Sequence, residues 1–324
     1  LASPGGKKMM RELDLIDVWF DSGSMPYAQL HYPFENKSIF EKQFPADFIA
    51  EGVDQTRGWF FTLHAISTLL FNSVAYKNVI SNGLVLDKNG NKMSKRLGNA
   101  VDPFKTINLH GADATRWYMI SNAQPWDNLK FDEEGIVEVK RKFFGTLYNT
   151  YSFYALYANI DNFNYEEEKQ PINKREKIDK WIISEMNSLI KEVESFYEDY
   201  EPTKAARAIQ SFVINKLSNW YIRLNRRRFW KGEYNYDKKN AYCTLFECLK
   251  DIALISSPIA PFYMDRLYQD LMKNEKSVHL ALFPKYDQKL IKPELEGEMQ
   301  LAQRLSSSIL SLRKKEKIRV RQPL

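Results

Sequence analysis

Two lysines stand three residues apart in a strongly polar run, NGNKMSKRLGN at 89–99. Lys92 and Lys95 enclose Met93 and Ser94, with asparagine and glycine on both sides. Mobile cations of this kind can bind a triphosphate and stabilise the charge on a departing pyrophosphate. The run lacks the glycine-rich turn of a Walker phosphate loop. By itself it favours an ordinary solvated turn.

A second candidate site lies in IAEGVDQTRGWFF at 49–61. Glu51 and Gly52 end an apolar run of strand length, and Asp54 and Gln55 follow before a helical segment. Ligands of open α/β sheets bind beyond the carboxyl ends of strands, where helix N-termini also point. The polar side chains could bind hydroxyls or an ammonium group, and Gly52 would let a ligand approach the backbone. A helix N-cap at Asp54, with Glu51 solvated, explains the same residues equally well.

Two further stretches carry indoles or arginines. Trp19 lies in DVWFDSG at 17–23, which we expect to be part of a strand, and is either a core residue or the wall of an apolar pocket. NWYIRLNRRRFW at 219–230 places three arginines on one helical face, interleaved with aromatic residues: Arg223, Arg226 and Arg227. Arginines with aromatics are typical of RNA binding. Aromatics facing inward beside solvated arginines are the alternative.

The elements that would position these residues fall into two classes. Residues 1–135 indicate an α/β region with strands at 14–20, 46–52 and 78–86 and a helix at 57–71. A strand, a helix and a second strand predict a parallel crossover, and hence part of a doubly wound sheet. Asn89 and Gly90 predict a tight hairpin turn at positive φ angles.

After residue 136 the pattern becomes helical. Apolar stripes predict long helices at 178–197, 203–230 and 238–256, with Thr203 as the cap of the second. These helices predict an antiparallel bundle, and the charged segment 161–177 is expected to be a surface loop within it. The predicted domains are therefore 1–135, 136–275 and a basic junction segment at 276–324.

Charge and cysteine content narrow the functional classes. The net charge is +6, and the segment 301–324 alone carries seven cations against one acid, which suggests a polyanionic partner. Cys243 and Cys248 are too few for a disulfide framework and predict buried free thiols in a reducing, intracellular setting. Neither a membrane segment nor a signal peptide is predicted. Four scattered histidines suggest no metal site. The ends of the sequence suggest a piece of a longer protein.

The motifs together resemble those of a known family. KMSKR at 92–96 resembles the second signature loop of class I aminoacyl-tRNA synthetases, normally Lys-Met-Ser-Lys-Ser. DVWFDSG, EGVDQTRGWF, NGLVLDKNGNKMSKRLGN and NWYIRLNRRRFW are similar, in the same order, to counterparts in the isoleucyl type of that family. The resemblance covers residues 14 to about 280. It implies the C-terminal half of a Rossmann-like catalytic domain, followed by an anticodon-stem-binding helical domain.

The resemblance also implies a reaction and roles. Isoleucine and ATP, with Mg²⁺, would give isoleucyl-adenylate, and the isoleucyl group would move to tRNA(Ile). Lys95, supported by Lys92, would stabilise the phosphates. The other residues fall into three implied groups: ATP contacts at Met93, Ser94, Asn82 and Gly83; adenylate and side-chain contacts at Glu51, Gly52, Asp54, Gln55, Trp59 and Trp19; tRNA contacts at Arg223, Arg226 and Arg227. A cytoplasmic monomer without a zinc site is implied.

Three departures qualify the resemblance. Arg96 replaces the terminal serine of the loop, and Asn82 stands where many relatives have histidine. The histidine-pair signature and the editing domain of the family are both missing from this sequence, so we expect it to be inactive by itself. A valyl or leucyl type of synthetase, or a non-catalytic tRNA-binding module of the same fold, are the alternatives.

Overall fold

The computed structural model describes residues 3–11, 13–14, 17–273 and 276–323. The chain divides into two compact units. The first comprises Leu1–Ser94 and Pro125–Lys130, and the second comprises Lys95–Gln124 and Phe131–Leu324.

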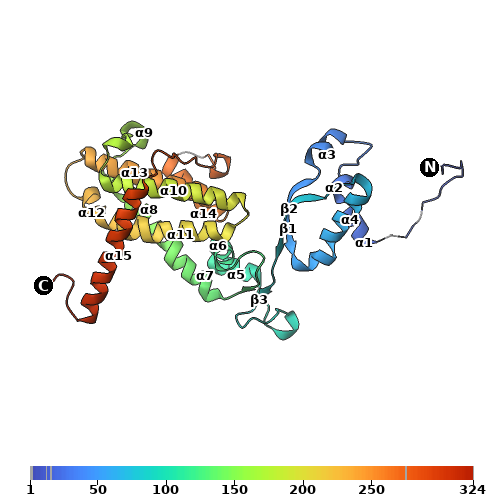
Figure 1. Ribbon diagram of the computed structural model, residues 1–324, viewed down its shortest axis with the longest axis horizontal. Helices are drawn as coiled ribbons and strands as arrows, with labels where there is room; N and C mark the ends of the chain where they lie inside the picture. Colours follow the sequence, from blue (N-terminus) through green and yellow to red (C-terminus); the bar gives the residue numbers. More distant parts are fainter. Residues whose placement is uncertain (1–2, 12, 15–16, 274–275, 324) are drawn as a thin grey trace. The chain divides into compact units, whose positions relative to one another are not determined.

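The first unit is built on a parallel crossover. Strand β1 (Ala46–Gly52) and strand β2 (Tyr76–Asn82) pair in parallel, and helix α4 (Trp59–Phe71) connects them (Figure 1). A 3-10 turn, Val53–Arg57, leads from β1 into α4. The predicted strand–helix–strand unit is thus confirmed.

Three short helices precede the sheet: α1 (Val18–Gly23), α2 (Met25–Ala28) and α3 (Lys37–Gln43). An aromatic cluster ties α3 and the segment before it to the end of α4, and comprises Tyr32, Phe40, Phe44 and Phe71. Helix α1 packs closely on α4, since a Cβ atom added at Gly23 would lie 2.8 Å from the Ile66 side chain.

The predicted strand at 14–20 is wrong. Residues 18–20 are helical, because the Asp17 carboxylate caps α1 by accepting a hydrogen bond from the Trp19 N–H at 2.9 Å. An aspartate at this position competes with an extended conformation by satisfying an otherwise unpaired helix N–H. Leu15 and Ile16, which belong to the same prediction, lie outside the described residues.

The predicted strand at 78–86 is interrupted. Strand β2 ends at Asn82, and a short strand β3 (Val85–Leu86) pairs in parallel with β4 (Leu129–Lys130). The hairpin that follows is confirmed by an antiparallel bridge between Leu86 and Lys92. Only Gly90 of the Asn-Gly pair has a positive φ, at 86°.

The second unit is helical. It begins with the 3-10 turn Lys95–Leu97 and the helices α5 (Pro103–His110), α6 (Ala112–Asn122) and α7 (Glu133–Val139). A π-helical stretch, Lys140–Phe144, continues into α8 (Gly145–Ile160), and the short α9 (Tyr165–Glu168) and a 3-10 turn, Ile172–Lys174, follow.

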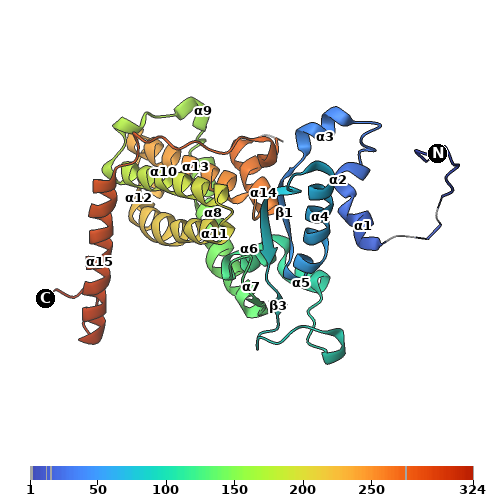
Figure 2. The same cartoon turned by 45° about the vertical axis from the view of Figure 1, so that its right-hand side comes forward.

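The long predicted helices are confirmed. They are α10 (Lys177–Glu198), the continuous run of α11 (Pro202–Ser211), a π-helical stretch (Phe212–Ile222) and α12 (Arg223–Trp230), and then α13 (Tyr236–Ser256). Helices α14 (Pro261–Met272) and α15 (Pro293–Lys315) complete the unit, with a 3-10 turn, Val278–Leu280, between them. Helix α13 packs against both α10 and α8 (Figures 1 and 2). Their shared core is aromatic and aliphatic.

Two details of the bundle differ from the sequence prediction. Thr203 is not the cap of α11, because Pro202 already occupies the first helical turn. Its hydroxyl instead donates to the carbonyls of Ile120 and Ala123 at 2.7 and 3.0 Å, and so ties α11 to the end of α6. In the segment 161–177, Arg175 is buried, so this stretch is only partly a surface loop.

Candidate functional site

The carboxyl ends of β1 and β2 bring two predicted site segments together. Gly52 is the register partner of Asn82, and Glu51 is the partner of Ser81. Glu51 is exposed, whereas Gly52 and Asn82 are half-buried. Ser81 was not predicted, although its buried hydroxyl has no hydrogen-bond partner among the described residues. These strand ends form the edge at which an α/β sheet binds ligands.

The amide of Gln55 organises the start of α4. Its Oε1 accepts a hydrogen bond from the Trp59 N–H at 3.1 Å, and its Nε2 donates to Asp54 Oδ2 at 3.1 Å. The N-cap residue of α4 is Gly58, and the first N–H of the helix is satisfied by the Gln55 side chain; Asp54, the cap in the alternative interpretation, does not cap α4. Asp54 folds back over Gly52, where an added Cβ atom would lie 2.6 Å from Asp54 Oδ1. A larger residue at 52 would therefore have to displace the Asp54 carboxylate.

The two predicted pocket indoles lie on elements that are joined to each other. The Trp59 Nε1–H donates to the carbonyl of Ser22 in α1 at 2.9 Å. The Trp19 ring lies against Gly58, where an added Cβ atom would meet ring carbons at 3.0 and 3.2 Å. Trp19 is 43% exposed, so part of this residue faces solvent. The pair could form part of an apolar wall.

The backbone of Asp127 packs so closely against Gly83 that a side chain would not fit there. An added Cβ atom would lie 2.2 Å from the carbonyl oxygen of Asp127. Its N–H donates to Pro125 O at 2.9 Å, and the next N–H, of Leu84, donates to Asn128 Oδ1 at 2.8 Å. The segment Pro125–Lys130 therefore passes directly over this point. A contact of Gly83 with ATP stays a prediction.

The turn before the lysines is organised by Asp87. Its Oδ1 accepts hydrogen bonds from the backbone N–H groups of Asn89 and Asn91 at 3.0 and 2.8 Å. This Asx-type turn returns the chain to Lys92, which is exposed, while Met93 and Ser94 are half-buried. Lys95 is exposed and begins the second unit. Its approach to the strand ends, like the phosphate role of the loop, stays a prediction.

The three predicted RNA-binding arginines lie on α12 with exposed side chains: Arg223, Arg226 and Arg227. The aromatic residues on either side of these arginines differ in exposure. Tyr221 is fully buried, whereas Trp230 is 52% exposed. The same helix thus faces the core with one side and presents arginines on the other.

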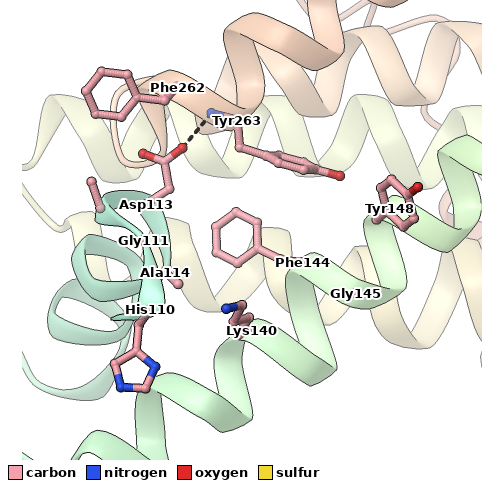
Figure 3. Close-up of a pocket in the computed structure, with 11 residues that line it drawn as sticks. His110, Gly111, Asp113, Ala114, Lys140, Phe144, Gly145, Tyr148, Phe262 and Tyr263 are labelled. Atoms are coloured by element: carbon pink, nitrogen blue, oxygen red, sulfur yellow. Dashed lines mark hydrogen bonds between the residues drawn. The ribbon is translucent and has the colours of Figure 1, made fainter. Parts of the chain in front are cut away.

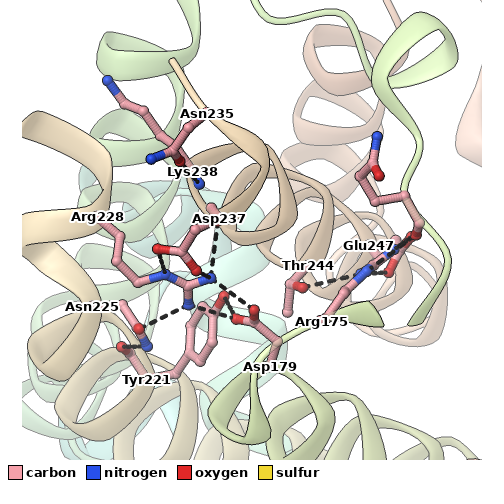
Figure 4. Close-up of polar contacts among 11 residues, drawn as sticks. Arg175, Asp179, Tyr221, Asn225, Arg228, Asn235, Asp237, Lys238, Thr244 and Glu247 are labelled. Carbon is pink, nitrogen blue, oxygen red and sulfur yellow. Dashed lines mark hydrogen bonds and ion pairs between the residues drawn. The ribbon is translucent and has the colours of Figure 1, made fainter. Parts of the chain in front are cut away.

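Sequence reasoning missed Arg228, which faces the core. Its guanidinium donates to both carboxylate oxygens of Asp179 at 2.9 and 2.8 Å and to Asp237 at 2.7 and 3.0 Å (Figure 4). The Tyr221 hydroxyl donates to Asp179 at 2.7 Å. Burial works to lower the pKa of Arg228, but the hydrogen bonds and charge of Asp179 outweigh it and keep that pKa above its ordinary value. The helical period was the available signal, since 221, 225 and 228 share one face.

A second buried arginine fixes the segment before α10. Arg175 makes two hydrogen bonds to Glu247, at 2.6 and 2.8 Å, and one to Thr244 at 3.0 Å (Figure 4). The Tyr165 hydroxyl also donates to Glu247, at 2.9 Å. Bidentate arginine–carboxylate pairs fix geometry as well as charge. These buried pairs explain how α12 and its arginines are held in register with α10 and α13.

The second unit also contains a pocket of about 670 Å³ between α6, α8 and the start of α14 (Figure 3). Four aromatic side chains contribute to its lining: Phe144, Tyr148, Phe262 and Tyr263. Asp113 at its edge accepts a hydrogen bond from the Tyr263 N–H at 2.5 Å and so caps α14, and burial raises the pKa of its carboxyl. The pocket contains no residue predicted from the sequence.

The structure also bears on metal sites, on the two cysteines and on membrane-spanning helices. Among the described residues no three His, Cys, Asp or Glu side chains gather as a metal site. Cys243 and Cys248 are buried free thiols, as predicted. No helix in the described ranges combines the length and the apolar character needed to cross a membrane.

Comparison with known proteins places these features in a family. The model for tRNA synthetases class I (I, L, M and V) matches residues 3–132, and that for the anticodon-binding domain of tRNA ligase matches residues 179–324. The isoleucine–tRNA ligase of Cytophaga hutchinsonii is 65% identical over the whole chain. The chain belongs to the class I tRNA synthetases. The isoleucine–tRNA ligases of Bacteroides fragilis and Clostridium tetani are 64% and 51% identical over 100% and 98% of this synthetase chain.

The synthetase chain spans 29–31% of the length of these relatives. Its fold resembles that of the LeuRS of Agrobacterium radiobacter K84, solved in a ternary complex with tRNA and LeuAMS, with a TM-score of 0.70 at 20% identity over 90% of this chain and 36% of that one. The methionyl-tRNA synthetase of Mycobacterium tuberculosis, in complex with methionyl-adenylate, gives a TM-score of 0.63 at 16% identity over 77% and 49%. These similarities support the predicted fold class, in which part of a Rossmann-like domain precedes a helical one.

Proposed function

We propose that this chain is part of an isoleucine–tRNA ligase, which activates L-isoleucine with ATP and transfers it to tRNA(Ile). The observation that carries the proposal is 64–65% identity, along the full chain, to ligases named for isoleucine. A valyl or leucyl type of synthetase, and a non-catalytic tRNA-binding module, are the alternatives.

The strand ends and the start of α4 would bind the aminoacyl-adenylate. The register pairing of Gly52 with Asn82 supports this, because it gathers Glu51, Gly52 and Asn82 at one sheet edge. Asp54 and Gln55 follow directly and are already ordered by their mutual hydrogen bond. Trp19 and Trp59 would contact the isoleucine side chain from elements joined through Ser22.

The loop from Lys92 to Lys95 would act on the phosphates. Lys95 would stabilise the charge that develops as pyrophosphate leaves, with Lys92 in support and with Met93, Ser94 and Gly83 beside the nucleotide. Catalysis would then rest on positioning and electrostatics. Mg²⁺ would accompany ATP as a counter-ion of its phosphates.

The exposed arginine face of α12 would contact tRNA phosphates through Arg223, Arg226 and Arg227. The support is geometric, since the buried pairs of Arg228 leave these three side chains facing solvent. We further propose functional boundaries at residues 135 and 275, a monomeric state and a cytoplasmic location, all as expected from the family.

The test is isoleucine-dependent ATP–pyrophosphate exchange by the full-length ligase that contains this segment. Lys95→Ala should lower the rate by about 100- to 1000-fold, the usual effect of removing one transition-state donor. Lys88→Ala, in the same exposed turn, is the matched control and should keep the wild-type rate. Faster exchange with valine or leucine than with isoleucine would contradict the proposal. The 324-residue chain alone should show no exchange.

A further inference from the structure

The aromatic pocket of the second unit has walls that are fixed by contacts within the protein. The buried Phe144 ring packs edge-on against the Tyr263 ring, with the two centroids 5.3 Å apart. The Asp113 carboxylate joins α6 to α14 by accepting a hydrogen bond from the Tyr263 N–H. Arg116 ties α6 to the segment before α14, because its Nε donates to the carbonyl of Ile259 at 2.9 Å. The pocket is therefore preformed rather than a loosely packed gap.

Two further aromatic side chains of the lining are largely exposed. Phe262 is 69% exposed and Tyr148 is 57% exposed, although both line the pocket. Single exposed apolar residues are common on protein surfaces, whereas several large rings gathered around one cavity mark a place of contact. The volume of about 670 Å³ falls within the range of small-molecule sites, which is about 300–1,000 Å³.

The pocket also has a positively charged side. Lys140 and His110 are drawn on one side of it, and Phe262 and Tyr263 on the other (Figure 3). The Lys140 side chain is exposed, and no hydrogen bond or ion pair of this side chain is recorded in the described ranges. Its ammonium group is therefore available at the edge of an apolar cavity.

His110 contributes a nitrogen without a hydrogen-bond partner. Its side chain is 10% exposed, and its Nε2 is buried and unpaired among the described residues. The Glu133 carboxylate lies 3.8 Å from this nitrogen, which is beyond hydrogen-bond distance. Native structures usually provide a partner for a buried polar atom. A ligand bound beside the ring would provide one, with the small side-chain rearrangement that binding commonly brings.

The start of α6 favours an anion at the same place. Helix α6 begins after Gly111, and none of the described side chains caps its N-terminus. Uncapped N–H groups and the helix dipole together attract negative charge. Ala112 and Ala114 of this first turn line the pocket. Asp113 is the acid of the turn, but its carboxylate is directed to the start of α14 (Figure 3).

We propose that this pocket binds a small molecule with a planar aromatic ring and one carboxylate group. The ring lies among Phe144, Tyr148 and Phe262, and the carboxylate lies between the Lys140 ammonium and the start of α6. Aromatic side chains suit a planar ring, and a charged donor suits a carboxylate. One carboxylate matches the pocket better than a phosphate dianion, because Lys140 is the single lysine or arginine among the lining residues. The inference is independent of the proposed function and uses none of its site residues.

Titration of the 324-residue chain with three probes, followed by saturation-transfer NMR, tests the proposal. Indoleacetate, indoleacetamide and tryptamine share one ring system and are anionic, neutral and cationic. Indoleacetate should bind about 10-fold more tightly than the amide, as expected when a charged hydrogen bond replaces a neutral one. Tryptamine should bind most weakly.

Two variants separate the charge contact from the ring contact. Lys140→Gln should weaken the binding of indoleacetate about 5- to 10-fold and leave that of the amide within about 2-fold. Its control is Lys142→Gln, in the same helical stretch but outside the lining, which should change neither affinity. Phe262→Ser should weaken both probes about 3- to 10-fold. Its control is Phe104→Ser, also outside the lining, which should weaken neither. All four side chains are exposed, so each variant should unfold at the wild-type temperature.

Several results would overturn the site. Equal affinity for the three probes would show apolar contact without an anion site. Unchanged affinity for indoleacetate in Lys140→Gln or in Phe262→Ser would place the probe elsewhere in the chain. Either result, or no binding of indoleacetate at all, overturns the proposal. The full-length ligase should bind indoleacetate as tightly as the 324-residue chain does. A loss of binding there would also overturn it, because another part of the ligase would then fill the pocket. Each of these results leaves the proposed ligase function standing.

Discussion

Replacing Arg228 with Met should destabilise the helical unit severely. Asp179 is fully buried and Arg228 is 15% exposed at the side chain, so the pair is shielded from water. The variant leaves a carboxylate in the core with the Tyr221 hydroxyl as its remaining side-chain donor among the described residues. Leaving a buried charge without its partner typically costs about 3–5 kcal/mol. Asp237 is 46% exposed. Losing its pair with Arg228 should add less than about 1 kcal/mol.

Urea denaturation of the 324-residue chain, followed by far-ultraviolet circular dichroism, measures this effect, because most of the helix belongs to the second unit. Lys177→Met is the matched control. It also breaks an ion pair, with Glu298 at 2.6 Å, but both side chains are more than half exposed, at 75% and 63%. It should cost at most about 1 kcal/mol. Adding Asp179→Asn to Arg228→Met should recover stability, since the buried charge is gone. An Arg228→Met variant as stable as the control would refute the reasoning.

Three further variants or measurements test other parts of the structure. Gly83→Ala should destabilise the first unit by about 1–3 kcal/mol, because its Cβ atom would lie 2.2 Å from Asp127 O. Limited proteolysis should then show faster cleavage of this variant. The control Gly297→Ala has open space around it and should be neutral or stabilising. Burial raises the pKa of Asp251 to about 6, so its carboxyl favours folding when protonated, and this stability is lost as the pH rises from about 4 through 6. Asp251→Asn should therefore gain about 3 kcal/mol relative to wild type between pH 4 and pH 7 in urea titrations; an equal difference at both values would contradict this. Cys243 and Cys248 are at most 1% exposed and burial raises the pKa of both thiols, so a disulfide reagent should label neither in the native chain and both in guanidinium; prompt native labelling would be the opposite result.

Much of the scaffold could be predicted from local sequence signals. The apolar runs at 46–52 and 57–71 have the lengths and patterns of a strand and a helix. The crossover rule then predicts that the strand after the helix pairs in parallel with the strand before it, as β2 does with β1. The apolar stripes that predict α10 and α13 likewise depend only on residues within each helix. The expected strand at 14–20 failed because a single capping bond from Asp17 outweighed an alternating pattern. Local pattern is weak evidence where a short polar side chain can satisfy a helix end.

The buried arginines could not be predicted in the same way. Arg175 and Arg228 occur in strongly charged stretches, and such stretches are usually solvated. Their more buried partners lie far away in sequence, since Arg228 pairs with Asp179 and Arg175 with Glu247. A charge is buried only when a partner meets it, and that meeting depends on how α10, α12 and α13 pack. The sequence shows that Arg228 shares a helical face with Tyr221. It does not show that the Asp179 carboxylate lies opposite that face.

Substitutions at the candidate site residues differ in whether a loss of activity would indicate a lost substrate contact or a disturbed scaffold. The Gln55 side chain accepts from the first N–H of α4, at Trp59, and Gly83 makes room for Asp127 O, so replacing either changes the scaffold before any ligand is considered. Glu51 is different, because it is exposed at the end of β1 and no hydrogen bond or ion pair of its side chain is recorded within the described ranges. Its replacement by Gln should therefore leave the fold intact. Only at positions like Glu51 and Lys95 does weaker catalysis report on contact with substrate rather than on the scaffold.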